Sequence, residues 1–196
     1  PDRTETGYGH IELGERISIR SRIEAYAVSA FHEKPDAINA ELYTQKGYLW
    51  NTGMFVWKAS TFLNEVRVNA PEVGACLPLL EDSPEAFFDA VPEGPVDTMI
   101  LERSTNVGVV QAAFSWDDMG SWESLARNGV PDEDHNIVIG KGAIQEGSHN
   151  IVYSEGGQVV LFGVENLVVV RTEETTLVIP RDRAADLKSL LQKLEE

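Results

Sequence analysis

The stretch FHEKPDAINAELYTQKGYLWNTGMFVW, residues Phe31–Trp57, decides the fold that we expect for this chain. Just before and into it, residues 26–31 alternate in the manner of a buried strand. We expect this strand to stop at Glu33-Lys34-Pro35, because proline has no amide proton for a sheet and disfavours helix in the residue before it.

A helix and a second strand are predicted in the rest of this stretch. Asp36 is placed to cap the helix and Gly47 to end it, with Ile38 and Leu42 four residues apart on its inner face. The apolar run at residues 53–57 then predicts another strand. The stretch therefore indicates an α/β fold built from a strand, a helix and a strand.

Three polar residues of the stretch are placed where open α/β sheets bind ligands, at strand ends or in turns. The carboxylate of Glu33 can accept hydrogen bonds from neighbouring sugar hydroxyls, the ammonium of Lys34 can meet a phosphate, and the amide of Asn51 donates and accepts. Together they suit a sugar phosphate. The plainer interpretation of Glu33 and Lys34 is an exposed ion pair beside a turn, worth about 0 to 1 kcal/mol.

The motifs FHEKP and YLWNTGMFVWK resemble the sugar-phosphate half of the mannose-1-phosphate guanylyltransferases, also called GDP-mannose pyrophosphorylases. The resemblance implies that Glu33 binds mannose hydroxyls, that Lys34 binds the phosphate, and that Asn51 and the backbone near Gly53 bind the sugar ring. TGYGHIE, residues 6–12, is a tight turn by itself, and the resemblance implies that backbone at Gly9 approaches the sugar. It also implies packing roles for residues 99–101.

An apolar, β-rich run at residues 107–114 predicts a strand covered on both faces, which leads into FSWDDMGSW, residues 114–122. One interpretation is that Asp117 or Asp118 caps a helix beginning near Trp122. The motif also resembles the element of the same family in which an aspartate binds Mg²⁺, and that position is Asp118. Magnesium takes oxygen ligands, usually one or two carboxylates together with substrate phosphates.

Composition narrows the class of protein. The chain has 196 residues, 42% of them hydrophobic, with a formal net charge of −16 and one cysteine. Nucleic acid and anionic membranes would be repelled by most of such a surface, so we expect neither as a partner. The single cysteine, Cys76, excludes an internal disulfide, and no apolar run reaches the roughly 20 residues of a membrane span. We infer a cytoplasmic protein.

Four similar apolar runs follow an acidic linker at residues 131–135, and each opens with a polar residue. Stacked strands would explain them, so we predict a small β-solenoid-like domain. After it, Asp182 is placed to cap a closing helix with leucines at 187, 190, 191 and 194. That apolar stripe packs either on its own β domain, which is the commoner arrangement, or on a partner subunit of a homodimer.

We therefore expect a mixed, Rossmann-like α/β part over residues 1–133 and a β domain with a closing helix over residues 134–196. The chain offers no glycine-rich phosphate loop followed by a helix, so we expect a nucleotide-binding N-terminal half to be missing from it. The resemblance implies formation of GDP-mannose and pyrophosphate from GTP and mannose 1-phosphate, with Mg²⁺ as cofactor. The alternatives are another sugar-1-phosphate nucleotidyltransferase and a non-catalytic sugar-phosphate-binding module.

Overall fold

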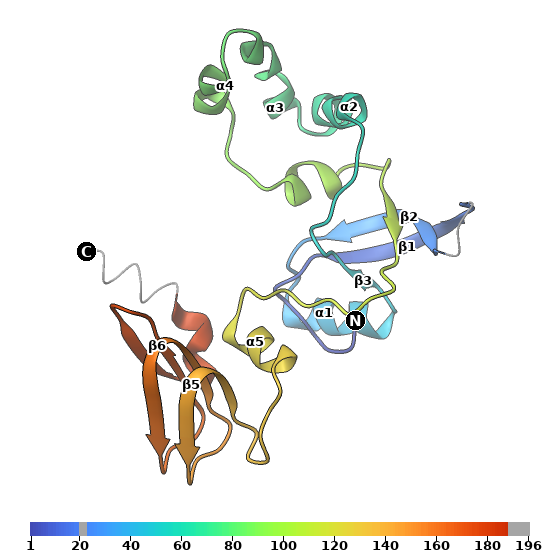
Figure 1. Ribbon diagram of the computed structural model, residues 1–196. Coiled ribbons are helices and arrows are strands. Elements are labelled where there is room, and N and C mark those ends of the chain that lie inside the picture. The colour runs from blue at the N-terminus through green and yellow to red at the C-terminus, as the bar shows by residue number, and fades with distance from the viewer. Residues whose placement is uncertain (20–22, 188–196) are drawn as a thin grey trace. The chain divides into compact units, whose positions relative to one another are not determined.

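The computed structural model describes residues 1–19 and 23–187, and the chain forms two compact units, Pro1–Ser115 and Trp116–Glu196 (Figure 1). Each unit contains one sheet of the described strands. The α/β class predicted from the sequence is confirmed. The predicted domain boundary between residues 133 and 134 stays a prediction.

The sheet of the first unit has the strand order β3-β1-β2-β4. Its strands are β1 (His10–Ile17), β2 (Ala25–His32), β3 (Leu49–Trp50) and β4 (Gly108–Val110). β1 pairs antiparallel with both β2 and β3, and His10 stands opposite His32 on one side and Trp50 on the other. The amino end of β1 therefore lies between the carboxyl ends of β2 and β3.

Helix α1 (Ala37–Gln45) connects β2 to β3, and Asp36 caps it as predicted by accepting a hydrogen bond from the Asn39 amide at 2.9 Å. The predicted inner face was wrong, since Ile38 is 81% and Leu42 41% exposed while Ala40 is fully buried. Residues two positions away from Ala40 lie about 200° around an α-helix from it. The helix therefore packs through Ala40 and through the ring of Tyr43, which stacks on His32 with ring centroids 4.7 Å apart, while Ile38 and Leu42 point outward.

The predicted strand at residues 53–57 is wrong, because the strand in this region is the shorter β3. Gly53 has a φ of +70°, which turns the chain out of the sheet. Phe55 and Trp57 are 36% and 44% exposed and stack on each other with ring centroids 5.4 Å apart. Among the described residues no strand lies beside this segment, and a strand needs a neighbour for its backbone hydrogen bonds.

A second correction concerns residues 107–114. Only Gly108–Val110 form a strand, β4, which pairs with β2 at the edge of the sheet. Val110 is 59% and Phe114 61% exposed, so this run is not covered on both faces. Its apolar sequence is typical of a central strand, but its position at an edge leaves much of it uncovered.

Helical segments between β3 and β4 complete the first unit: α2 (Ala59–Asn69), α3 (Pro71–Gly74), η1 (Leu77–Glu81), α4 (Pro84–Ala90) and the π-helical turn η2 (Asp97–Leu101). Ile100 packs with Val66 and Ala70 of the helices, whereas Leu101 packs with Ile11 and Phe31 of the sheet. The packing roles implied for these two residues are therefore observed, and η2 is anchored in both clusters.

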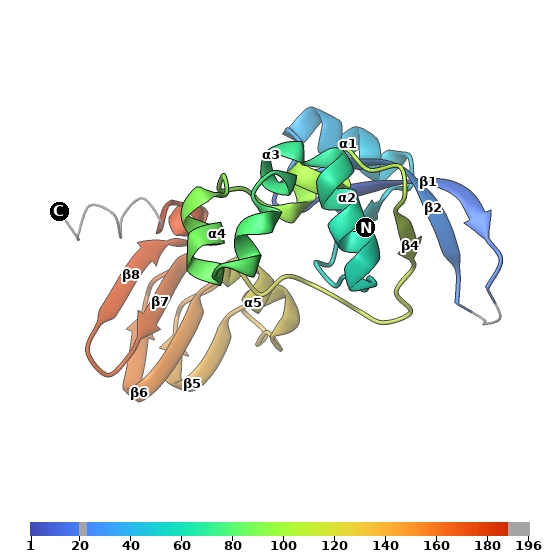
Figure 2. The same cartoon turned by 90° about the horizontal axis from the view of Figure 1, so that it is seen from above.

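The second unit contains helix α5 (Trp122–Asn128) and a sheet with the strand order β5-β6-β7-β8 (Figure 2). Its strands are β5 (Ile137–Gln145), β6 (Ile151–Phe162), β7 (Leu167–Arg171) and β8 (Thr176–Pro180). The first three are parallel and β8 is antiparallel to β7. All four apolar runs identified in the sequence therefore form strands.

Asparagines at the strand starts make a buried ladder. The side-chain oxygen of Asn136 accepts from the amide of Asn150 at 3.0 Å, and that of Asn150 accepts from the amide of Leu167 at 3.0 Å. Asp132 accepts from the Asn136 amide at 2.8 Å and closes the ladder at this end. The ladder gives partners to backbone groups at the corners, which would otherwise be buried without hydrogen bonds.

The chain end differs from the prediction at Asp182, which lies inside the 3-10 turn η3 (Arg181–Asp186) rather than at a helix N-cap. The predicted leucine stripe beyond Leu187 lies outside the described residues. Within residues 1–19 and 23–187, none of the helices has the length and hydropathy needed to span a membrane.

Candidate functional site

The predicted sugar-phosphate residues lie close together at one end of strands β1, β2 and β3 in the first unit's sheet. Gly9 precedes β1, Glu33 and Lys34 follow β2, and Asn51 follows β3. The antiparallel pairing places these chain positions side by side, and the Asn51 amide donates to the Gly9 carbonyl at 2.8 Å. The amide of Gly53 in turn donates to the Asn51 side-chain oxygen at 3.0 Å.

Glu33 lies directly over the backbone of Gly9. A Cβ atom added to Gly9 would stand 2.7 Å from Oε2 of Glu33 and 3.0 Å from Cζ of Phe31, both closer than ordinary contact. Glycine is therefore needed at this position for close approach of the Glu33 carboxylate. The same approach leaves the Glu33 side chain only 14% exposed.

Lys34 differs from Glu33 in exposure, because its side chain is 65% exposed while its Nζ lies 3.0 Å from Oε1 of Glu33. Its φ of +46° is in the left-handed region, which residues other than glycine rarely adopt and which is frequent at binding sites. A surface ion pair accounts for this contact. It does not account for the burial of Glu33 against Gly9.

The side chain of Asn51 is held at both ends. Its Nδ2 donates to Oδ1 of Asp97 at 2.9 Å, and its Oδ1 accepts from Gly53, whose φ of +70° tightens the turn. On the other side of the site, the amide of Glu33 donates to Oε1 of Glu102 at 2.8 Å. Neither acidic residue was predicted from the sequence; their only signal was a pair of carboxylates flanking the segment TMIL, residues 98–101.

The turn that carries Gly9 is packed by aromatic residues. His10 is fully buried, its Nδ1 lies 3.1 Å from the Tyr8 carbonyl oxygen, and burial lowers the pKa of its imidazole. The ring of Tyr8 makes an edge contact with Trp50 at a centroid distance of 5.4 Å. These contacts therefore hold in place the backbone at Gly9, which a bound sugar would contact.

Asp118 belongs to the second unit, where it is exposed and accepts a hydrogen bond from the Gly120 amide at 3.2 Å. Neither aspartate of the motif caps α5, because Ser121 does so through the Ser124 amide. Asp117 instead forms a bidentate ion pair with Arg127 at 2.7 and 3.0 Å.

A metal ion bound by protein side chains alone has no support in the described part of the chain, where no three His, Cys, Asp or Glu side chains gather as a metal site. One exposed carboxylate, that of Asp118, fits a magnesium ion that takes most of its oxygen ligands from elsewhere. The residues present are therefore compatible with Mg²⁺ shared with a substrate phosphate.

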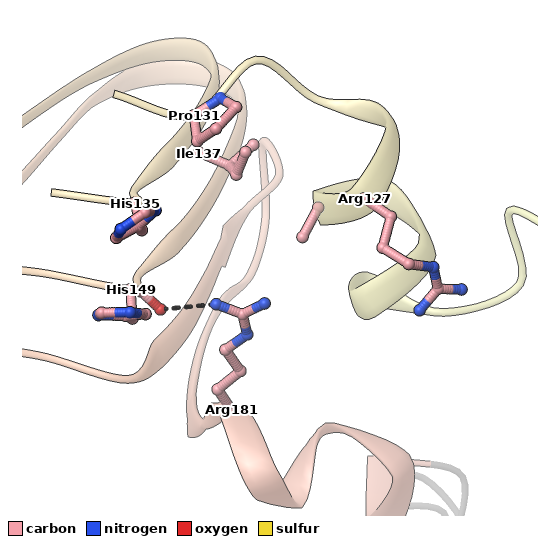
Figure 3. Close-up of a pocket in the computed structure, with 7 residues that line it drawn as sticks. Arg127, Pro131, His135, Ile137, His149 and Arg181 are labelled. Carbon is pink, nitrogen blue, oxygen red and sulfur yellow. Dashed lines mark hydrogen bonds between the residues drawn. The ribbon is translucent and has the colours of Figure 1, made fainter. Parts of the chain in front are cut away.

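A separate pocket of about 260 Å³ lies in the second unit, between α5 and the strand starts, and Figure 3 shows its walls. The rings of His135 and His149 lie 5.1 Å apart, and Arg181 donates to the His149 carbonyl at 3.2 Å. Arg181 also forms a bidentate ion pair with Glu123 at 2.6 and 2.8 Å. Since its two arginines, Arg127 and Arg181, are paired with carboxylates, we assign this pocket to the packing of α5.

Comparison with known proteins finds a matching family for each of two parts of the chain. Residues 1–134 match the Nucleotidyl transferase family, and residues 144–194 match the MannoseP isomerase/GMP-like beta-helix domain. The chain is similar over its full length to a crystal structure of a mannose-1-phosphate geranyltransferase from Thermus thermophilus, with a TM-score of 0.86, 31% identity and 58% of that chain covered.

Among the curated relatives of the chain are mannose-1-phosphate guanylyltransferases and an alginate biosynthesis protein. Mannose-1-phosphate guanylyltransferase from Escherichia coli K12 is 33% identical over 100% of this chain and 43% of its own length. The RfbM enzyme of the same name from Salmonella typhimurium is 34% identical over 100% of this chain and 42% of its own length. Alginate biosynthesis protein AlgA from Pseudomonas aeruginosa is 30% identical over 98% of this chain and 42% of its own length. The chain thus spans less than half the length of these relatives.

Proposed function

The chain belongs to the Nucleotidyl transferase family, and from this premise we propose that it is the sugar-phosphate part of an enzyme that forms GDP-mannose and pyrophosphate from GTP and mannose 1-phosphate. The strongest support is that Gly9, Glu33, Lys34 and Asn51 lie close together at the same end of neighbouring strands. The names of the relatives point to the same reaction.

In this proposal the sugar rests on the backbone at Gly9 and Gly53. The Glu33 carboxylate accepts hydrogen bonds from adjacent hydroxyls of the ring, and the Asn51 amide contacts the ring from the β3 side. A carboxylate that is only 14% exposed discriminates well between hydroxyl positions, because a mispaired buried acceptor is costly.

Lys34 binds the phosphate of mannose 1-phosphate. An oxygen of this phosphate attacks the α-phosphorus of the nucleotide in line. Two phosphates must approach each other against their mutual repulsion, so catalysis consists mainly of positioning and charge neutralisation. The exposed ammonium of Lys34 is suited to this, since it can turn from Glu33 to the phosphate. Asp118 would hold Mg²⁺, which when bound offsets negative charge on the phosphates.

Several partners belong to the same proposal. GTP would be bound by a preceding nucleotide-binding half, and the length of the relatives supports such a half. A homodimer formed through the leucine stripe at residues 187–194 stays a prediction.

The cellular location is part of the proposal as well. The single cysteine supports a cytoplasmic location.

The experiment is a pyrophosphate-release assay of the chain joined to its nucleotide-binding half, with GTP, Mg²⁺ and mannose 1-phosphate. Lys34→Ala should raise the KM for mannose 1-phosphate and lower kcat, and Asp118→Asn should lower the Mg²⁺-dependent activity and raise the Mg²⁺ concentration needed for half-maximal turnover. Asp117→Asn is the matched control, because Asp117 is paired with Arg127. Unchanged turnover in Lys34→Ala would contradict the role of Lys34, and undiminished Mg²⁺-dependent activity in Asp118→Asn would contradict that of Asp118.

The alternatives give different results in the same assay. Faster turnover with glucose 1-phosphate and another nucleotide would identify a different sugar nucleotidyltransferase. Binding of mannose 1-phosphate without any pyrophosphate release would identify a non-catalytic binding module.

A further inference from the structure

The π-helical turn η2 contacts the candidate site at two points, although no residue of it belongs to the site motifs. Asp97, the first residue of the turn, accepts a hydrogen bond from the Asn51 side chain at 2.9 Å. Glu102, which ends the turn, accepts one from the Glu33 amide at 2.8 Å. The turn therefore connects the ends of β2 and β3 from outside the sheet.

The π geometry is what allows both contacts. In an α-helix, residues five apart point about 140° away from each other, because each residue turns the chain by about 100°. A π-helix closes its hydrogen bonds between residues five apart and so brings them back to one face. Here the amide of Glu102 donates to the carbonyl of Asp97 at 2.9 Å. The two acidic residues are therefore the pair that the hydrogen bond of the π-helical turn joins.

Asp97 determines which way the Asn51 amide faces. Oδ1 of Asn51 accepts from the Gly53 amide, and Nδ2 donates to the Asp97 carboxylate. The reversed amide would place its oxygen against a carboxylate oxygen and its NH₂ group against an N–H group, which loses both bonds. The orientation of Asn51 is thus fixed before any ligand arrives.

The turn itself is held firmly. Ile100 is 6% exposed in the helical cluster, and Leu101 is 7% exposed in the sheet cluster. A turn anchored by these two apolar side chains holds its two carboxylates at constrained positions. Preorganised groups of this kind lower the cost of ordering a site when ligand binds.

We propose that Asp97 and Glu102 are positioning residues for the sugar phosphate, joined by a π turn so that Asp97 orients Asn51 and Glu102 fixes the backbone of Glu33. This rests on the proposed function, because it concerns the sugar subsite of that reaction. Neither carboxylate need touch the sugar phosphate, and each acts through the residue that it holds.

The test measures KM for mannose 1-phosphate, KM for GTP, kcat and Tm in the chain joined to its nucleotide-binding half. Asp97→Ala should raise the KM for mannose 1-phosphate about 10-fold or more, as expected for a lost hydrogen bond to a charged group, with the KM for GTP unchanged. Glu102→Ala should give a smaller rise, because water can replace its carboxylate at the exposed amide of Glu33. Asp97→Asn and Glu102→Gln keep an acceptor and should restore most of the affinity.

Thr98→Ala is the matched control, since Thr98 lies in the same turn and bonds only weakly, at 3.4 Å, to the Pro95 carbonyl among its described contacts. Kinetic constants close to wild type are expected for it. An Asp97→Ala enzyme with an unchanged KM for mannose 1-phosphate, or with equal rises in both KM values, would overturn the proposal.

A second readout separates this inference from the proposed function. The side-chain NH₂ resonances of Asn51 should shift in Asp97→Ala and exchange faster with solvent, whatever the substrate. If wild type turned over no sugar 1-phosphate, the proposed function would fail, and with it the claim of substrate positioning. Unchanged Asn51 resonances in Asp97→Ala would overturn the positioning role even in an active enzyme.

Discussion

Replacing Gly9 by alanine adds one methyl group at the point where Glu33 approaches the backbone. The new Cβ would lie 2.7 Å from Oε2 of Glu33 and 3.0 Å from Cζ of Phe31. The two neighbours respond differently. The carboxylate is the end of a flexible side chain and can swing away, whereas the Phe31 ring is 6% exposed and is held in the sheet core.

The expected loss of stability in Gly9→Ala follows from this difference between the two neighbours. Overpacking of a core costs about 1 to 3 kcal/mol, and we expect Gly9→Ala to destabilise the first unit by about 1 to 2 kcal/mol because one neighbour can move. The larger effect should be on binding. A displaced Glu33 carboxylate loses hydrogen bonds to the sugar that are worth about 1.5 to 3 kcal/mol, which raises the KM for mannose 1-phosphate about 10- to 100-fold.

The assay combines urea unfolding with steady-state kinetics, and Gly7→Ala is its control in the same turn. A Cβ on Gly7 would meet only the Oε1 atom of Glu5, at 3.2 Å, so a change within about 0.5 kcal/mol is expected. In a Glu33→Ala background, Gly9→Ala should also cost less stability, because one clash is gone. A Gly9→Ala enzyme with wild-type KM would refute the argument that glycine serves the approach of Glu33.

Three further predictions concern the scaffold. Asn150→Ala should destabilise the second unit by about 3 kcal/mol or more in urea unfolding, since Asn150 is fully buried and its loss leaves backbone groups such as the Leu167 amide unpaired; an effect below about 1 kcal/mol would contradict the ladder. Asp36→Ala should cost about 1 kcal/mol through the lost cap of α1, with Asp36→Asn retaining most of it. Hydrogen bonds from Arg181 hold the pKa of Glu123 below its ordinary value of 4.5, so their stabilisation is present above that pH and lost as pH falls through the lowered pKa. Glu123→Gln should remove this part of the acid sensitivity in unfolding at pH 3 to 6, and an identical pH profile would argue against it.

The parts of the site that the sequence predicted are those fixed by local chemistry. Pro35 ends β2 and places Glu33 and Lys34 at its end, Asp36 caps the helix that follows, and a glycine at position 53 permits the positive φ after Asn51. Each of these effects acts over a few residues, so it can be read from a short motif.

The errors concern features that depend on neighbours far along the chain. Residues 53–57 and 107–114 have the composition of buried strands, but a strand and its burial depend on what lies beside it. The first run has no neighbouring strand among the described residues, and the second lies at the edge of its sheet. Similarly, Ile38 and Leu42 have helical spacing, yet Ala40 and Tyr43 are the residues through which the helix packs.

The support for the site has the same non-local origin. The hydrogen bond from Asn51 to Asp97 spans 46 residues, and that from Glu33 to Glu102 spans 69. The hydrogen bonds within the site motifs are local, but the orientation of Asn51 and the fixing of Glu33 require η2 to dock through Ile100 and Leu101. A ligand that binds only this assembled arrangement stabilises it by mass action. Binding of the sugar phosphate should therefore protect the amides of η2 from hydrogen exchange as strongly as those of the motif residues, because ligand and docked turn favour the same state.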